Sequence, residues 1–411
     1  DASADTSVVG YNVYRDSVLI ATSSSTSASD SSLVPSTTYL YAVSAYDSHG
    51  HESEPSASIQ VTTKSTSAPV ISSISGTPSD GQTITLRGAG FGIHDLDLEW
   101  LGGAEGAIEQ GNLGDVFSKE GWLVDPDSGG FSSSRYDDGQ AHSGSEAIRS
   151  NIDSTPEQGK WGAGFKYDRG APISSIYATW WVYTDPAEGE GGQWKMWRLQ
   201  PYNNYVDCDG EIKSFHWYEE NHDHSMFYVM ITSDKDDYAQ SYPNGNADLR
   251  WLDNDDGPNT KQWTRIELYA VESSSPGVRD GTFVYNIHKQ TEPVKNLMNW
   301  EDDIMSRALG VEDRWQYFTF QNYWGNGNAD NADFWIDDIY LQFGTRARVE
   351  IGDNPVWAEC THREVQNPTA WSEGSIDITL NQGSFEAGDE VYLFVIDEEG
   401  QASAGYPIVI A

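Results

Sequence analysis

The chain has 411 residues, enough for two or three domains that each bury a core of their own. It carries 64 acidic against 24 basic residues, a formal net charge of -40, which would repel nucleic acid and anionic membrane surfaces. Sixteen Trp and 22 Tyr exclude a disordered acidic chain, and no apolar run is long enough to span a bilayer. We expect a folded, β-rich protein, extracellular or on a cell surface, where salt screens its carboxylates.

Residues 1–64 form the first predicted unit. Short runs of alternating apolar and polar residues predict strands at Gly10–Asp16, Leu33–Tyr41 and Val43–Asp47. In order and spacing these runs resemble the later strands of a fibronectin type III domain. That resemblance implies a sandwich, and the two strands that the family places before the first run are not in this sequence.

Such a unit would expose a sheet edge near Gly10–Asp16 and an apolar face with Val13, Leu19, Tyr39 and Val43. Strands added by neighbouring copies of the chain would cover both and build an open fibre. Alternatively, the two strands precede this sequence in the same polypeptide. Both possibilities stay open.

The next unit is predicted to be divided between residues 69–99 and residues 344–411. The first part holds Gly81-x-x-Ile-Thr-Leu-x-Gly-x-Gly-Phe-Gly92, and the second holds Trp371-Ser-x-x-Ser-Ile376. These motifs resemble the immunoglobulin-like sandwich of the IPT/TIG type, which is continuous in that family. The break therefore predicts an insertion, tolerated because loop-closure entropy grows slowly with length.

The predicted insert, residues 100–343, is rich in short aromatic runs such as Ile176–Tyr183, Trp315–Phe320 and Phe334–Leu341. Many such runs separated by turn residues predict an antiparallel two-sheet jelly roll. The strand Trp263-x-Arg-x-Glu267, the Asp280-Gly281 turn and the closing strand Ile336-Asp-Asp-Ile-Tyr340 look like those of concanavalin A-like lectin/glucanase sandwiches. That family includes lectins, carbohydrate-binding modules, glycoside hydrolases and polysaccharide lyases, so the fold does not choose between binding and catalysis.

A concave sheet that presents aromatic, cationic and amide side chains would suit a sugar chain, because flat rings stack on pyranose faces and donors orient hydroxyls. The candidate carbohydrate-binding residues are Trp194, Trp197, Arg198, Gln200, His216, Tyr218 and Gln321. The alternative is that these aromatic residues fill the core between the sheets. For any single Trp the core is our expectation.

The compact signatures of alginate lyases and the paired carboxylates of laminarinase-type hydrolases are absent. We therefore expect a secreted or cell-surface modular protein that binds a polysaccharide or surface glycan, or builds an extracellular structure as an adhesin or fibre-like subunit, without catalysis. The alternative is a polysaccharide lyase or glycoside hydrolase that acts on an extracellular glycan through the insert.

Oxygen-rich side chains near the end of the insert predict a calcium ion, which takes six to eight oxygen ligands. The candidate ligands are Asn326, Asn328, Asp330, Asp333 and Asp337. Asp337 and Asp338 are adjacent on a predicted strand, so one should point inward and need a cation or backbone donors. The two cysteines, Cys208 and Cys360, either pair across the insert or stay free.

Overall fold

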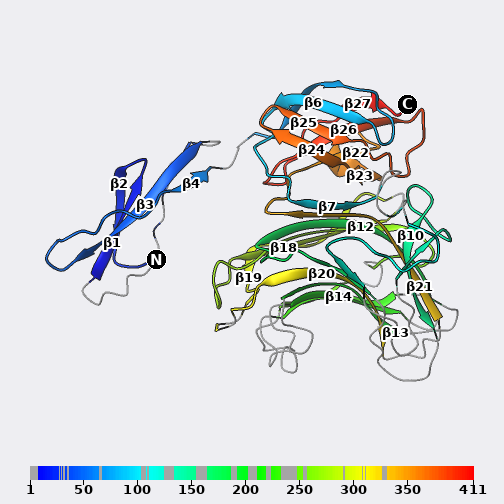
Figure 1. The fold of residues 1–411 in the computed structure, drawn as a ribbon, viewed down its shortest axis with the longest axis horizontal. Coiled ribbons are helices and arrows are strands. Elements are labelled where there is room, and N and C mark those ends of the chain that lie inside the picture. Colours follow the sequence, from blue (N-terminus) through cyan, green and yellow to red (C-terminus); the bar gives the residue numbers. More distant parts are fainter. Residues whose placement is uncertain are drawn as a thin grey trace. The chain divides into compact units, whose positions relative to one another are not determined.

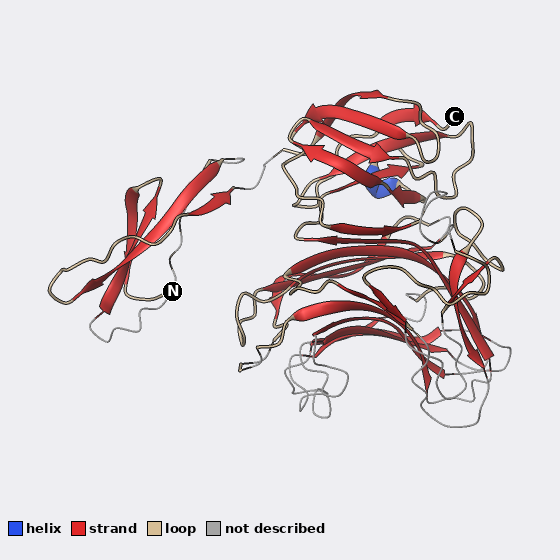
Figure 2. Ribbon diagram, viewed as in Figure 1, coloured by secondary structure: helices blue, strands red, loops and turns tan. Residues whose placement is uncertain are grey.

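A computed structural model of the chain is almost entirely antiparallel β-structure, which confirms the predicted all-β class (Figure 2). It forms two compact units, residues 1–68 and residues 69–411. Its described helix is a single 3-10 turn, Trp357–Glu359, and none of the described helical residues could cross a membrane. The structure describes residues 8–26, 28, 30, 33–34, 37–63, 67–102, 108, 111–124, 134–153, 164–186, 192–201, 211–218, 224–232, 248–252, 257–289, 292–307, 309–310, 312–325 and 331–411.

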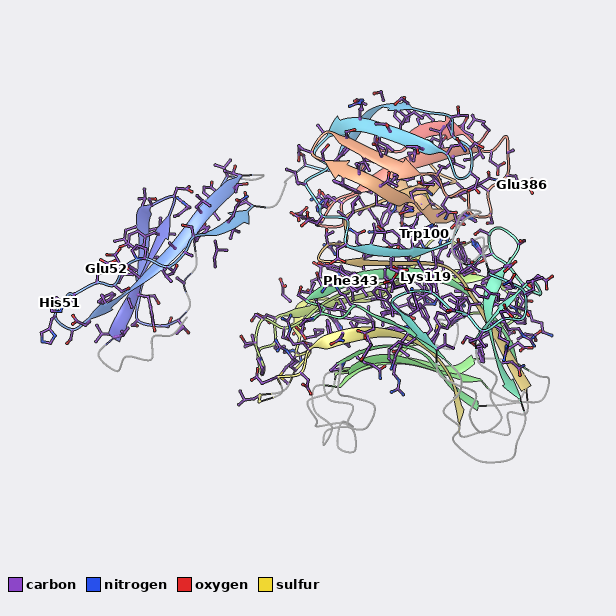
Figure 3. The ribbon with its side chains drawn as sticks, in the orientation of Figure 1. His51, Glu52, Trp100, Lys119, Phe343 and Glu386 are labelled. Atoms are coloured by element: carbon purple, nitrogen blue, oxygen red, sulfur yellow. The ribbon has the colours of Figure 1, made fainter. Side chains whose placement is uncertain are left out.

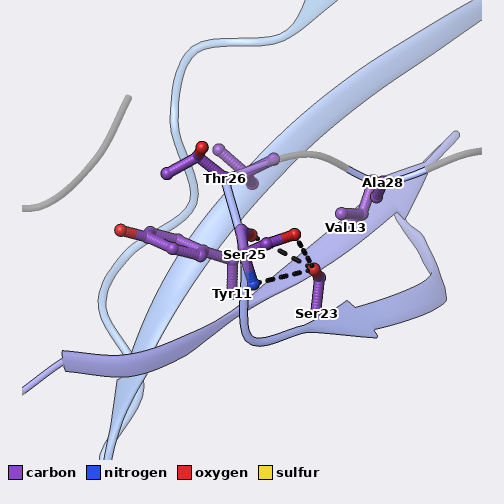
Figure 4. A pocket seen from close by; sticks show the side chains of 7 residues that line it. Tyr11, Val13, Ser23, Ser25, Thr26 and Ala28 are labelled. Atoms are coloured by element: carbon purple, nitrogen blue, oxygen red, sulfur yellow. Dashed lines mark hydrogen bonds between the residues drawn. The ribbon is translucent and has the colours of Figure 1, made fainter.

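The first unit is one four-stranded antiparallel sheet in the order β2-β1-β3-β4, so β1 is paired on both sides and the expected sheet edge near Gly10–Asp16 is wrong. Its strands are β1 (Val8–Arg15), β2 (Val18–Ser23), β3 (Thr38–Asp47) and β4 (Ile59–Thr62). The register places Val13 opposite Val43, and both line a hollow with Tyr11 (Figure 4). Leu19 lies opposite Tyr14 after a bulge, so it is on the other face from Val13. The expectation that Leu19 and Val13 share an apolar face is therefore wrong.

The second unit begins with a sandwich of two four-stranded sheets, ordered β24-β25-β6-β5 and β23-β22-β26-β27. The strands are β5 (Val70–Ser75), β6 (Thr83–Ala89), β22 (Arg348–Gly352), β23 (Arg363–Val365), β24 (Asn367–Ser372), β25 (Ser375–Thr379), β26 (Glu390–Ile396) and β27 (Tyr406–Val409). Ile84 of β6 lies opposite Ile378 of β25, and both are fully buried in one core. Segments on either side of the long intervening block therefore share one sheet.

A close backbone approach inside this sandwich requires a glycine. A Cβ atom on Gly88 of β6 would lie 1.9 Å from the carbonyl oxygen of Val70 on β5 and 2.5 Å from the Phe91 ring. Only a residue without a side chain fits there.

Between β6 and β22 the chain forms two larger sheets. The eight-stranded sheet has the order β19-β18-β17-β12-β21-β10-β9, with β7 also paired to β21. Its strands are β7 (Leu98–Leu101), β9 (Arg135–Asp137), β10 (Ala147–Asp153), β12 (Ser175–Pro186), β17 (Thr264–Val271), β18 (Gly281–Lys289), β19 (Lys295–Ile304) and β21 (Asn331–Phe343).

The seven-stranded sheet has the order β16-β15-β14-β13-β20-β11-β8. Its strands are β8 (Trp122–Val124), β11 (Phe165–Asp168), β13 (Gly192–Pro201), β14 (Glu211–Tyr218), β15 (His224–Thr232), β16 (Asp248–Leu252) and β20 (Trp315–Gly325). Both sheets curve, and the seven-stranded sheet lies on the inside of the curve (Figure 1).

The eight-stranded sheet packs against the seven-stranded sheet on one face and against the sandwich on the other, as strand β12 illustrates. Successive side chains of a strand point to opposite faces. Ile176, Ala178 and Trp180 belong to the core between the two large sheets. Tyr177 and Trp181, on the other face, pack in clusters that face the sandwich. Trp100 of β7 lies at this junction (Figure 3).

A buried ionic cluster joins β17 of the large sheet to β22 and β23 of the sandwich. Arg265 Nη2 lies 2.6 Å from Glu350 Oε1, and Arg265 Nη1 donates to the Arg363 carbonyl at 2.9 Å. Burial alone would raise the pKa of Glu350, but Arg363, Arg348 and Arg265 hold it well below its usual range. The charges therefore fix the sandwich on the sheet.

Candidate functional site

The outward face of the seven-stranded sheet carries a row of polar side chains at its centre. In β20, Phe318 and Phe320 point into the core, so Tyr317 and Thr319 point outward. In β13 the register places Arg198 opposite Thr319 and Gln200 opposite Tyr317. Residues directly opposite each other share a face, so all four lie on the side away from the core.

Contacts along this row fix its geometry. Thr319 Oγ1 donates to Gln200 Oε1 at 2.7 Å, and Lys166 Nζ of β11 lies 4.6 Å from the centre of the Tyr317 ring. Arg198 and Gln200 are 3% and 7% exposed, whereas Lys166 and Tyr317 are half-buried. The accessible part of the row is therefore an aromatic ring beside an ammonium group.

These groups are chemically suited to recognising a sugar. A tyrosine ring offers a flat apolar face with a polar edge, and an ammonium or guanidinium group can bond hydroxyls or a carboxylate. The exposed Leu123 of β8 lies next to Lys166 in register and extends the face by an apolar side chain. The outward face is therefore the candidate site.

The structure divides the predicted carbohydrate-binding residues into three groups. Arg198 and Gln200 lie side by side on the outward face, where both are buried, and their role as site residues stays a prediction. Trp197 is fully buried between the large sheets, parallel to Phe318 at 6.0 Å, so its ring offers no face to a sugar. The side chains of the other four predicted residues lie outside the described part of the structure; they are Trp194, His216, Tyr218 and Gln321.

Sequence reasoning missed Lys166, Tyr317 and Thr319. The signal was present for two of them, because the alternation in Trp315–Phe320 separates Tyr317 and Thr319 from the two phenylalanines. Lys166 comes from a strand paired to β20 on its other side, and nothing local in the sequence indicated that neighbour.

Of the predicted calcium ligands, Asn326, Asn328 and Asp330 lie outside the described residues, so the calcium site stays a prediction. Asp333 lies 2.8 Å from Arg149 Nη2 and accepts a hydrogen bond from Asn151. A guanidinium group therefore compensates this carboxylate.

Asp337 and Asp338 correct the expectation that only one of them points inward. Both are 2% exposed, because β21 carries an extra residue opposite β12 and Asp338 adopts a left-handed φ of 47°. Asp337 Oδ2 accepts hydrogen bonds from the backbone N–H groups of His142 and Ser143. Burial and the adjacent Asp338 raise the pKa of Asp337 well above its usual range.

Cys360 is a free, buried thiol. Burial raises its pKa to about 11, so it is protonated at neutral pH. Cys208 lies outside the described residues.

No protein-family model matches the chain. Short segments are similar to three known enzymes. Exoglucanase B of Cellulomonas fimi is 41% identical over 86 residues, 20% of this chain and 8% of that protein. A poly(3-hydroxybutyrate) depolymerase of Ralstonia pickettii is 44% identical over 55 residues (13% and 11%), and chitinase Chi52 of Paenibacillus xylanexedens is 44% identical over 69 residues (16% and 13%). The matches thus span a small part of each relative.

Solved structures with a similar arrangement include an endo-β-1,4-glucuronan lyase from Trichoderma reesei and lectin UEA-II in complex with galactose. The lyase is 12% identical, with a TM-score of 0.34, and the match covers 56% of this chain and 91% of that chain. The lectin is 10% identical, with a TM-score of 0.33, covering 56% and 96%.

Proposed function

We propose that the protein is an extracellular or cell-surface, carbohydrate-binding protein, and that the outward face of the seven-stranded sheet is its binding site. The observation that carries this proposal is the row of Lys166, Tyr317, Thr319, Arg198 and Gln200, which places a ring, cations and neutral donors on one face. The names of two relatives, exoglucanase and chitinase, denote enzymes that act on polysaccharides and support a glycan as partner. The depolymerase among the relatives is named for a polyester, so that match does not support a glycan as partner.

The test is a binding measurement on immobilised neutral and uronic acid-containing polysaccharides. We expect retention of the wild-type chain on at least one glycan, and a loss of about tenfold or more in affinity for Y317A and K166A. The matched control is K261A, which removes an exposed lysine from the loop before β17 of the other large sheet. No binding to any glycan, or equal binding by all variants, would contradict the proposal.

The second candidate is a polysaccharide lyase that uses the same face. It is favoured by the proximity of Tyr317 to Lys166 and of Arg198 to Thr319 and Gln200, because a cation that neutralises a uronate carboxylate acidifies the C5 proton. Incubation with alginate, ulvan or glucuronan distinguishes the two functions. A rise in ultraviolet absorbance from unsaturated products, lost in Y317A, would replace the binding function with lyase activity.

A structural role as a fibre-like subunit would depend on the first unit. Ile59 and Val61 of its edge strand β4 are 68% and 45% exposed, and a strand from another copy could cover them. Light scattering of the wild-type chain and of the doubly substituted I59K/V61K chain tests this role. Assemblies that persist in the substituted chain, or a monomeric wild type at high concentration, would exclude it.

A further inference from the structure

Three side chains of metal-binding type meet where the large sheets join the sandwich. His142 lies in the loop between β9 and β10, His362 immediately precedes β23, and Glu364 lies within β23. One nitrogen from each histidine and a carboxylate oxygen of Glu364 all lie within 4.8 Å of one another. Among the described His, Cys, Asp and Glu side chains, these three form a group whose ligand atoms are close enough to share one metal ion.

His142 is held with one ring nitrogen directed at this meeting point. Its Nδ1 lies 2.8 Å from Asp338 Oδ2, and its ring stacks on Trp181 with centroids 3.8 Å apart. If Nδ1–H donates to Asp338, the neutral ring has its lone pair on Nε2. That Nε2 is buried without a hydrogen-bond partner among the described residues, 3.5 Å from Glu364 Oε1. A lone pair facing a carboxylate is unfavourable unless a proton or a metal cation lies between them.

Glu364 is fixed from both sides. Its Oε2 accepts a hydrogen bond from Trp181 Nε1 at 3.1 Å, and its Oε1 lies 2.6 Å from His362 Nε2. The same Oε1 accepts a hydrogen bond from the Ser384 backbone N–H at 3.4 Å and lies 3.5 Å from His142 Nε2. Glu364 Oε1 thus faces both histidine rings.

Charge balance also favours a divalent cation. The side chains of Asp338, His142 and Glu364 are at most 1% exposed, so two carboxylates lie buried against one imidazole ring and a cation at its Nε2 would offset their charge. A carboxylate bonded to the far nitrogen of a metal-bound histidine is the usual outer partner of such a site. Asp338 occupies that position.

We propose that His142 Nε2, His362 Nε2 and Glu364 Oε1 bind a divalent transition-metal ion, with Zn²⁺ the best fit to two imidazoles and one carboxylate. Ligands about 2.1 Å from a tetrahedral ion lie about 3.4 Å apart, close to the observed 3.5 Å between His142 and Glu364. His362 Nε2 lies 2.6 Å from Glu364 Oε1, and the ligand atoms of the two histidines lie within 4.8 Å of each other, so the His362 ring would shift by on the order of 1 Å when the ion binds. The His362 side chain is 23% exposed and Ser384 beside it is exposed, so solvent reaches the fourth position.

The bound ion would clamp the β9–β10 loop to the sandwich. His142 belongs to one part and both other ligands to the other, so the ion binds the folded junction and not the unfolded chain. This role does not depend on glycan binding at the opposite sheet.

The test titrates the full, chelator-treated chain with Zn²⁺ by calorimetry and with Co²⁺ by visible spectroscopy, in the presence of excess Ca²⁺ to saturate exposed carboxylates. We expect one tight site, a Co²⁺ spectrum of low coordination number and a melting temperature that rises with Zn²⁺ concentration. Absence of such a site in the wild-type chain would overturn the proposal.

Variants then assign the site. H362Q should weaken Zn²⁺ binding by more than about 100-fold, and D338N, which removes only the outer partner, by about 10- to 100-fold. H51Q is the matched control, since His51 lies exposed in the first unit. Unchanged affinity in H362Q would show that the ion binds elsewhere and would overturn the assignment.

A gain-of-ligand variant covers the case in which H362Q does not fold. Ser384 Oγ lies 3.3 Å from His362 Nε2, so S384C places a thiol at the fourth position. With Co²⁺, S384C should show a thiolate-to-cobalt charge-transfer band that the wild-type chain, with its native cysteines, lacks. Folded S384C without that band would contradict the proposed geometry.

Discussion

Arg265 Nη2 of β17 lies 2.6 Å from Glu350 Oε1 of β22, and both side chains are at most 2% exposed. The pair connects the eight-stranded sheet to the sandwich. Arg348 and Arg363 also contact Glu350, and Trp357 Nε1 donates to its second oxygen at 2.6 Å. The carboxylates of Glu350 and Glu267 thus together compensate three buried guanidinium groups.

Replacing Glu350 by glutamine should destabilise the second unit by about 3 to 5 kcal/mol, because it leaves buried guanidinium groups without compensation. Since the folded pKa of Glu350 is lowered, its contribution is present above about pH 4.5 and is lost as the pH falls below it. Urea unfolding at pH 7 and pH 3 measures both effects. E301Q, at an exposed ion pair with Arg346, should change stability by less than about 1 kcal/mol; a similar cost for both variants would contradict this account.

His288 should make stability depend on pH in a separate range. Burial, with Arg363 and Arg265 nearby, lowers its pKa to about 4, so the folded ring is neutral. An unfolded histidine titrates near about 6.5, so the stability it contributes is present above that pH and lost as the pH falls toward 4. H288Q can still donate to the Thr361 carbonyl and should flatten the unfolding free energy between pH 6.5 and 4. The prediction fails if wild type and H288Q show the same slope there.

Trp197 and Tyr317 should respond in opposite ways to truncation. W197A removes a ring from the core and should cost about 3 to 5 kcal/mol of stability. Y317A, on the outward face, should cost less than about 1 kcal/mol while it reduces glycan binding. Denaturant unfolding and glycan affinity, measured on both variants, check the assignment of the two faces. It would be wrong if Y317A proved the more destabilising change.

Ile84 and Ile378 should be energetically coupled although the large sheets separate them in the sequence. They lie directly opposite each other on β6 and β25, so the I84A/I378A double-mutant cycle should give an interaction energy of about 0.5 to 3 kcal/mol. Ile84 and Ile266 lie in different cores and should be additive. A zero coupling for the first pair would argue against a shared sandwich.

How far the sequence determines the molecule is clearest in β12. The two-residue period of a strand is local, so alternation alone is enough to separate Ile176, Ala178 and Trp180 from Tyr177 and Trp181. The side chains on both faces are mainly apolar, so the pattern does not predict that the sandwich covers the face of Tyr177 and Trp181. That depends on which distant strands pack there.

The candidate sites show the same division. His362 and Glu364 are two residues apart, so alternation along a strand places them on one face. Their meeting with His142 and Asp338 was decided only by the tertiary structure, through the bulge at Asp338 and the packing of one loop against β23. On the outward face, alternation separated Tyr317 from the phenylalanines beside it, whereas its proximity to Lys166 depends on strand order. Side-chain period is encoded locally, but neighbours across sheets are set by long-range pairing, which local patterns do not specify.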